Sequence, residues 1–215
     1  MLWRYAPGGT VAAVPISLLS PSLCWACGAA ARGHALCRAC RGGLRWSESA
    51  TRPAHGVPAW APVLYDGPAR ALIGGLKFRG ARGLAGELAA AIAAGAPAGL
   101  LEGALVPVPL APRRRRERGY NQAEALAGAL AERTGLPVCD VLERSGGAAR
   151  QLGRGRGARL AQAPTFSTRR ISPPRAVLVD DVITTGATLA ACARALHAAG
   201  AREVAAVAYA RTPGR

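Results

Sequence analysis

The sequence has a single lysine, Lys77, among its 28 basic residues, and only 12 acidic residues. Its formal net charge is therefore +16 at pH 7, which favours anionic ligands such as phosphates and keeps nucleic acid open as a partner. Part of this charge reflects composition, because arginine replaces lysine in an alanine-rich and glycine-rich background typical of a GC-rich genome. Aromatic residues make up only 5% of the chain, which slightly weakens the case for stacking on single-stranded nucleic acid.

The sequence also lacks an apolar run long enough to cross a bilayer. The alanine-rich run at residues 84–98 is interrupted by a glutamate, a glycine and a proline. Residues 11–19 are modestly apolar but contain Pro15, and they lack the uninterrupted apolar region and cleavage site of a signal peptide. We therefore expect a cytoplasmic protein without membrane insertion.

Length and periodicity predict one sizeable α/β domain with a small appendage. The chain has 215 residues, of which 50% are hydrophobic, enough for one packed core. Strands are expected at residues 59–65, 105–108, 137–142, 177–179 and 201–209, and helices at 69–76, 84–94, 122–133 and 189–199. This alternation is typical of a parallel sheet with crossover helices. A linker rich in Ser, Pro and Gly at 46–58 would separate a module at 1–50 from a domain at 51–215.

Four of the six cysteines are spaced as the two knuckles of a metal site. The pattern Cys-x2-Cys-x9-Cys-x2-Cys is formed by Cys24, Cys27, Cys37 and Cys40. Each pair can aim two thiolates at one tetrahedral ion, so the pattern predicts structural zinc with all four cysteines as ligands. The alternatives are that His34 replaces one sulfur, that disulfides form, which a cytoplasmic chain disfavours, or that the thiols stay free. Zinc would hold together a module too small for its own core, without taking part in chemistry.

An apolar strand at 177–179 runs into two adjacent carboxylates and a hydroxyl-rich turn. Asp180 and Asp181 follow at the carboxyl end of the strand, where open α/β sheets bind their ligands. The turn can offer backbone N–H groups and hydroxyls to a phosphate at the start of a helix, through Thr184, Thr185, Gly186, Ala187 and Thr188. The carboxylates suit the hydroxyls of a ribose, and the turn suits its 5′-phosphate. A solvated acidic turn and an ordinary helix cap would each explain one part, but not the parts in this order.

The segment Val177–Leu189 resembles the thirteen-residue signature of type I phosphoribosyltransferases, in which apolar residues precede two acids and a Thr-Thr-Gly phosphate loop. The resemblance implies the type I phosphoribosyltransferase fold, and it implies 5-phosphoribosyl 1-pyrophosphate (PRPP) with Mg²⁺ as the ligand. It further implies that Asp180 and Asp181 bind the ribose hydroxyls as catalytic residues, while the turn at 184–188 binds the 5′-phosphate.

An arginine-rich segment follows the strand expected at 105–108. It runs from Val106 to Gln122 and contains Arg113, Arg114, Arg115, Arg116 and Arg118. Five guanidinium groups cannot all be buried, and arginine binds a diphosphate in bidentate fashion. Arg116 and Arg118 are the candidates to hold a pyrophosphate. The alternatives are a solvated basic start of a helix and a nucleic-acid-binding patch.

Because this segment begins Val-Pro-Val-Pro and ends Arg-Gly-Tyr-Asn-Gln, it resembles the ComF family in particular. Members of that family are competence-associated proteins that join a cysteine ribbon to a phosphoribosyltransferase-like domain. Residues 20–28 resemble the start of the family's ribbon, and residues 76–80 resemble its Lys-Phe-Arg element. The resemblance makes Lys77 a candidate catalytic residue, with a lone exposed lysine as the alternative.

Residues 144–166 resemble the mobile loop of the ComF family, with Gln151 and Arg159 at matching positions. The chain departs from the family pattern at residues 161–163 and just before Gln151. These departures lie in the loop that the resemblance expects to close over the site, and they therefore count against loop closure and against catalysis.

Two classes of function follow from the resemblance. The first is a phosphoribosyltransferase, which transfers the pentosyl group to an acceptor. The second is a non-catalytic component of DNA uptake in natural transformation, which senses PRPP or binds single-stranded DNA. The acceptor would lie under a hood at residues 59–82, but no base-recognition pattern is visible there, and the oligomeric state cannot be read from the sequence.

Overall fold

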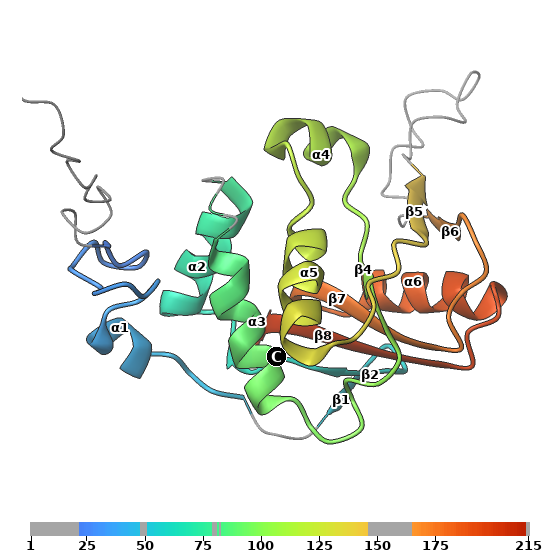
Figure 1. The fold of residues 1–215 in the computed structure, drawn as a ribbon, viewed down its shortest axis with the longest axis horizontal. Helices are drawn as coiled ribbons and strands as arrows, with labels where there is room; N and C mark the ends of the chain where they lie inside the picture. The colour runs from blue at the N-terminus through green and yellow to red at the C-terminus, as the bar shows by residue number, and fades with distance from the viewer. Residues whose placement is uncertain (1–21, 48–50, 79–80, 82, 146–164, 214–215) are drawn as a thin grey trace, which may run out of the picture.

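The computed structural model describes residues 22–47, 51–78, 81, 83–145 and 165–213 (Figure 1). Its central feature is a six-stranded sheet in the order β1-β2-β8-β7-β4, with β3 pairing with β8. All of its pairs are parallel except β1 with β2, which form an antiparallel hairpin. The strands are β1 (Arg52–Ala54), β2 (Val57–Trp60), β3 (Val63–Leu64), β4 (Ala104–Pro107), β7 (Arg175–Ile183) and β8 (Glu203–Arg211).

Helices cover both faces of the sheet (Figure 1). Val177 and Val179 of β7 pack into one apolar core with α2 (Gly67–Phe78), α3 (Leu84–Gly95) and α5 (Gln122–Thr134). Leu178, which points to the opposite face, packs into a second core with α6 (Ala187–Ala198). Since successive strand residues alternate between faces, burial on both sides explains why β7 reads as a continuous apolar run. The predicted α/β fold, with a parallel sheet flanked by helices, is confirmed.

A separate two-stranded hairpin consists of β5 (Leu142–Ser145) and β6 (Thr165–Thr168). Its strands flank residues 146–164, which lie outside the described residues. The predicted positions Gln151, Arg159 and 161–163 therefore lie outside the described part of the chain as well.

Several predicted segments differ from the structure. The strand expected at 137–142 does not form, because Val138 makes only a single bridge to Leu105 at the edge of the sheet and Leu142 instead begins β5. The strand expected at 59–65 is divided into β2 and β3 near Pro62, which cannot donate a ladder hydrogen bond. The linker expected at 46–58 contains β1 and the start of β2. The arginine-rich segment forms an additional helix, α4 (Pro112–Arg118), with proline in its first turn.

The cysteine-rich module packs against the larger domain. Leu36 of the module and Leu76 of α2 belong to one apolar cluster, and a Cβ added at Gly75 would lie 2.7 Å from the Trp25 ring. The backbone N–H of Ala35 donates to Glu87 Oε2 of α3 at 2.7 Å. The module is thus part of a shared core, and the domain boundary near residue 50 stays a prediction.

Among the helices in the described ranges, none combines the length and the apolar character that a bilayer crossing requires.

Candidate functional site

The two adjacent carboxylates lie inside β7, since the ladder with β8 continues to Ile183 beyond them. Their side chains have different neighbours, because Asp181 contacts Lys77 of α2 whereas Asp180 interacts with Arg144 of β5 and Cys192 of α6. Asp181 is only 4% exposed, whereas Asp180 is half-buried. The acid pair thus offers one carboxylate toward α2 and the other toward α6 and the β5–β6 hairpin.

Lys77 reaches Asp181 from the last turn of α2. Its Nζ lies 2.5 Å from Asp181 Oδ2, and the two side chains are 19% and 6% exposed. This oxygen has no other polar partner among the described residues. A nearly buried carboxylate is costly without a paired cation, so the ion pair with Lys77 offsets the cost of burying the Asp181 side chain. The structure therefore brings together two of the predicted catalytic residues, which are separated by about a hundred positions in the sequence.

Asp180 lies in a different electrostatic environment. Burial raises the pKa of its carboxyl well above the ordinary value, and the adjacent charge of Asp181 raises it further, while Lys77 acts in the opposite direction. Burial lowers the pKa of Arg144, as does the nearby charge of Arg114, whereas Cys192 and Asp180 raise it. The Arg144 guanidinium also lies over the Phe166 ring, 5.7 Å from its centroid. Arg144 of β5 therefore lies within electrostatic reach of both Asp180 and Arg114 of α4.

The raised pKa of Asp180 predicts how the stability of the ligand-free protein depends on pH. A carboxyl whose pKa is raised by folding contributes stability at low pH, and this contribution is lost as the pH rises through the raised pKa. We therefore expect Asp180→Asn to melt a few degrees higher than the wild type at neutral pH. The difference should shrink as the pH falls toward the ordinary value of 3.8. Asp140→Asn, at an exposed carboxyl, is the control, and a lower melting temperature for Asp180→Asn at pH 7 would contradict the assignment.

The turn after β7 leaves polar groups available to a ligand. Thr184 and Thr185 are exposed, Thr188 is half-buried, and the turn leads directly into α6. The position that precedes α6 is Gly186, which has no side chain to cap the first N–H groups of the helix. The Ala187 N–H donates to Thr185 Oγ1 at 3.3 Å. Free N–H groups and hydroxyls at a helix N-terminus are the donors that a phosphate requires.

Gly186 is required at its position for two separate reasons. Its φ is +87°, in the left-handed region, and an added Cβ would lie 2.5 Å from Ala54 Cβ in the β1–β2 hairpin. Left-handed backbone alone costs an L-residue about 1–2 kcal/mol, and the clash adds to this. We expect Gly186→Ala to lower the melting temperature by about 4 °C or more. Gly128→Ala, in open space within α5, should be neutral or stabilising; equal melting temperatures for the two variants would contradict this account.

The arginines of α4 differ in the partners that their guanidinium groups contact. Arg113 pairs with Glu117 and Arg115 with Glu124, each at 2.8 Å. Arg118 is half-buried, and its guanidinium carbon lies 4.9 Å from the centroid of the Phe78 ring. Arg116 is exposed, and within the described residues it has no hydrogen-bond or ion-pair partner. Arg114 is exposed as well. The guanidinium groups of Arg114 and Arg116 are therefore the ones in α4 that remain available to an anion.

The residues that follow α4 have structural roles. Asn121 is 2% exposed, accepts a hydrogen bond from the Ala123 N–H at the start of α5, and donates to the Val108 carbonyl at 3.0 Å. The Tyr120 hydroxyl donates to the Leu76 carbonyl at the end of α2. These contacts fix α4 and α5 against the helix that carries Lys77.

The four predicted metal ligands converge. The sulfur atoms of Cys24, Cys27, Cys37 and Cys40 all lie within 4.8 Å of one another, and His34 is not part of the cluster. The Sγ atoms of Cys27 and Cys37 are 3.7 Å apart. A tetrahedral Zn²⁺ with Zn–S bonds of about 2.3 Å would space its sulfurs by about 3.8 Å, so the cluster fits zinc. Cys37 precedes helix α1 (Arg38–Gly42), and Cys40 lies within it.

Backbone amides support a thiolate in this cluster. Burial alone would raise the pKa of the Cys24 thiol, but N–H groups of Cys37, Cys27 and Ala26 donate to its sulfur and lower its pKa to about 6. Amides that point at sulfur stabilise the charged form that binds metal. The donor set and its surroundings therefore suit a closed structural site with no open coordination position.

Comparison with known proteins bears on the part of the chain that contains the acid pair and the turn at 184–188. Residues 120–215 match the phosphoribosyl transferase domain family. The second half of the chain is thus a phosphoribosyltransferase-like domain. Competence protein ComFC of Streptococcus pneumoniae is 36% identical over 101 residues, which make up 46% of this chain and 44% of that protein. ComFC of Bacillus subtilis is 36% identical over 94 residues, 43% of this chain and 37% of that protein.

Competence protein F of Haemophilus influenzae is 35% identical over 107 residues, 47% of this chain and 47% of that protein. The predicted resemblance to the ComF family is confirmed. Each match spans less than half the length of the relative concerned. A solved structure of the allosteric regulatory enzyme of purine biosynthesis is 22% identical, with a TM-score of 0.38, over 60% of this chain and 25% of that one; a likeness this distant says nothing about chemistry.

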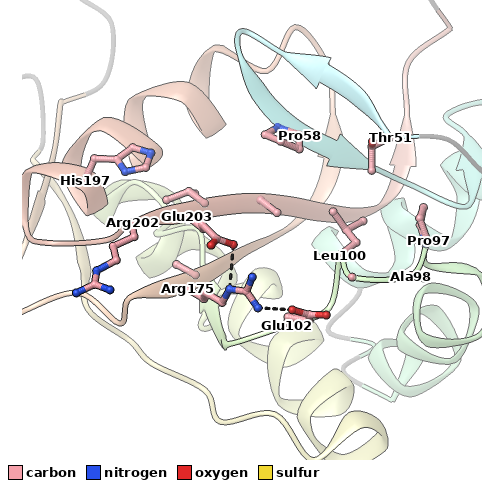
Figure 2. Close-up of a pocket in the computed structure, with 14 residues that line it drawn as sticks. Thr51, Pro58, Pro97, Ala98, Leu100, Glu102, Arg175, His197, Arg202 and Glu203 are labelled. Carbon is pink, nitrogen blue, oxygen red and sulfur yellow. Dashed lines mark hydrogen bonds and ion pairs between the residues drawn. The ribbon is translucent and has the colours of Figure 1, made fainter.

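A cavity of about 570 Å³ lies at the opposite end of the parallel strands, where β7 and β8 begin (Figure 2). Figure 2 shows Arg175 between Glu102 and Glu203, with Arg175 Nε 2.9 Å from Glu203 Oε2. None of the lining residues belongs to the acid pair or to the turn at 184–188. The cavity is therefore separate from the candidate site.

Sequence reasoning missed the contributions of Arg144 and Tyr120. Arg144 lies on β5, and its position beside Asp180 depends on the hairpin, which no periodic pattern indicated. Tyr120 belongs to the motif that carried the resemblance, but its contact with Leu76 could not be read from spacing. Arg118 was expected to bind an anion; its guanidinium lies over Phe78, and its role toward an anion stays a prediction.

Proposed function

We propose that this protein binds PRPP with Mg²⁺ and transfers its phosphoribosyl group to an acceptor, with release of pyrophosphate. The observation that carries the proposal is the order of groups along β7 and α6. A buried acid paired with Lys77 is followed by a turn with exposed threonines and by a helix start at which Gly186 has no capping side chain. The ComF-like relatives and the phosphoribosyltransferase-like domain support the same ligand class.

Each part of the site has one task in this proposal. The turn at 184–188 binds the 5′-phosphate through its amides and hydroxyls. Asp180 and Asp181 accept hydrogen bonds from the ribose hydroxyls, and Lys77 holds the Asp181 carboxylate in place through their ion pair. Mg²⁺, when bound with the substrate, neutralises pyrophosphate oxygens, as a hard cation held largely by substrate and water does. Arg114, Arg116 and Arg144 supply the remaining positive charge for the leaving group.

The reaction exchanges one bond at the anomeric carbon for another. The bond from this carbon to the pyrophosphate oxygen breaks with its electron pair leaving on the pyrophosphate, a bond to the acceptor nucleophile forms, and the acceptor releases its proton to water. Positive charge develops on the ribose, and negative charge develops on the leaving diphosphate. Catalysis is then mainly positioning and electrostatic stabilisation by the fixed charges of the site. Calorimetric titration with PRPP, with and without Mg²⁺, followed by pyrophosphate-release assays over candidate bases and amines, tests the proposal.

The alternative is a non-catalytic part of DNA uptake that senses PRPP or binds single-stranded DNA. Two observations favour it: the curated relatives are named competence proteins, and Arg114 and Arg116 are exposed. Exposed guanidinium groups on one helix bind a nucleic-acid backbone as readily as a diphosphate. Under this alternative the protein binds a sugar phosphate but does not convert it to a product.

Arg116 separates these two functions. We expect Arg116→Ala to weaken PRPP binding about tenfold while the affinity for ribose 5-phosphate stays nearly unchanged, because only PRPP carries the diphosphate. Arg113→Ala, which removes a guanidinium already paired with Glu117, is the matched control. If Arg116 serves DNA, the salt slope of oligonucleotide binding should fall by about 0.7. Equal loss of both sugar ligands with no change on DNA would contradict both functions.

A further inference from the structure

The surface of the cysteine-rich module carries charge of one sign. Residues 22–47 contain four arginines and no acidic residue. One of the four, Arg45, is paired with Asp66 of the larger domain at 2.9 Å. The guanidinium groups of the other three are exposed, and they have no hydrogen-bond or ion-pair partner among the described residues. These three residues are Arg32, Arg38 and Arg41.

The three unpaired arginines line one pocket. The pocket has a volume of about 320 Å³, the exposed imidazole of His34 also lines it, and none of its lining residues is acidic. Arg38 and Arg41 lie three positions apart in α1, which makes them neighbours on the surface of that helix. A concave surface with charge of one sign concentrates ions of the opposite sign. The pocket therefore favours an anion.

The backbone at Arg32 has a conformation that an arginine disfavours. Its φ is +46°, in the left-handed region, where a side chain is in close contact with the backbone and glycine is not. The Ala31 N–H donates to the Ser22 carbonyl at 2.7 Å, and the His34 N–H donates to the Ala31 carbonyl at 3.0 Å, so the turn around Arg32 is closed on both sides. Strained residues of this kind occur at ligand-binding sites, where the side chain has a task.

The chemistry of the pocket indicates a diphosphate group. Each guanidinium can bind two oxygens in bidentate fashion, so three of them reach more oxygens than a single phosphate group presents. A zinc ion bound by four thiolates carries a net negative charge, but the three guanidinium groups outnumber that charge, so the pocket stays positive with the metal in place. A nucleic-acid strand fits less well, because the pocket is compact and has no aromatic lining residue on which a base could stack.

We propose that this pocket binds a small molecule with a diphosphate group through Arg32, Arg38 and Arg41. None of its lining residues belongs to β7, α4 or α6, so the pocket is separate from the candidate phosphoribosyl site. The inference goes beyond the proposed function and does not depend on it, because neither the acid pair nor the turn at 184–188 takes part.

Amide exchange followed by mass spectrometry measures binding at this pocket separately from binding elsewhere. We expect pyrophosphate to slow exchange in residues 30–41 of the full-length protein, whereas sodium chloride at the same ionic strength should not. Arg38→Ala and Arg32→Gly should each raise the midpoint concentration of this protection about tenfold. Arg32→Gly should also melt no lower than the wild type, because glycine relaxes the turn. Arg45→Ala, in the same module but already ion-paired, is the matched control.

Further ligands identify the class of molecule. Adenosine 5′-diphosphate with a midpoint at or below that of pyrophosphate assigns the pocket to nucleotides, and a higher midpoint assigns it to free pyrophosphate; both support a diphosphate site. Inorganic phosphate that protects residues 30–41 as well as pyrophosphate does would overturn the diphosphate class. An oligonucleotide that protects them at a lower phosphate concentration than pyrophosphate would overturn the proposal in favour of nucleic acid.

Two results would show that the three arginines form only a solvated basic surface. One is unchanged exchange in residues 30–41 at millimolar pyrophosphate, and the other is an equal loss of protection in Arg45→Ala. Arg116→Ala, in the candidate phosphoribosyl site, should leave the midpoint for residues 30–41 unchanged. A protein that fails to bind PRPP but shows this protection would therefore refute the proposed function alone.

Discussion

Replacing Asp180 and Asp181 together by alanine is expected to weaken Mg²⁺-dependent PRPP binding by well over tenfold. In the proposed complex each carboxylate accepts a hydrogen bond from a ribose hydroxyl, and hydrogen bonds to charged groups contribute about 1.5–3 kcal/mol each. Asp181 is nearly buried, so water cannot replace it. Isothermal titration with PRPP in the presence of Mg²⁺ measures the loss.

The double alanine variant also leaves Lys77 without its partner in a place where it is only 19% exposed. The double asparagine variant keeps the size of both side chains and serves as a second measurement if the alanine variant folds poorly. Asp140→Ala removes an exposed carboxyl elsewhere and should change the affinity by no more than about twofold. Undiminished affinity in both double variants, with melting curves that show a folded protein, would refute the role of the acid pair.

The sequence was sufficient for the parts of the site that are contiguous in the chain. The apolar run before Asp180 predicted a strand buried on both faces, and β7 has its alternate residues in two cores. The turn at 184–188 was predicted because glycine and hydroxyl residues are needed locally, and Gly186 does have the left-handed backbone of such a turn. The cysteine pattern likewise placed four sulfurs in one cluster.

The spacing of hydrophobic residues could not predict contacts between segments that are distant in the sequence. Lys77 was singled out by the resemblance of residues 76–80 to the Lys-Phe-Arg element of the ComF family, but nothing in its neighbours indicated that α2 would end beside Asp181. The partners of the arginines in α4 also depend on tertiary packing, because Glu117 and Glu124 neutralise two of them while Arg118 turns toward Phe78. The strand predicted at 137–142 failed for the same reason, since a suitable local sequence formed only one bridge at the edge of the sheet.

Helix α2 connects the cysteine cluster to the candidate site. Its Gly75 lies so close to Trp25 that no larger residue fits without a shift, and two residues later Lys77 contacts Asp181. The spacing of helix residues places these contacts within one turn of each other. The cysteine-rich module therefore helps to hold α2, and with it Lys77, in position. In our proposal its sulfurs take no part in the chemistry.

Removal of zinc from the cluster is expected to have the second large effect. We expect one zinc per chain, bound by Cys24, Cys27, Cys37 and Cys40, and structural zinc contributes on the order of 10 kcal/mol of apparent binding energy in small modules. Chelation or Cys37→Ser should therefore accelerate amide exchange in residues 22–47. Because Trp25 and Leu36 pack with α2, protection in α2 should fall as well, whereas β7 and α6 should stay protected. Hydrogen exchange followed by mass spectrometry measures both.

Ribose 5-phosphate binding is the readout that separates a structural metal from a catalytic one. The turn at 184–188 and the acid pair lie on β7 and α6, so their affinity for this ligand should survive Cys37→Ser. Cys139→Ser, which changes a half-buried cysteine outside the cluster, should leave zinc content and exchange unchanged. Protein purified under reducing conditions without zinc would refute the metal assignment. Loss of ribose 5-phosphate binding on chelation would show instead that unfolding of the cysteine-rich module also disturbs the turn at 184–188.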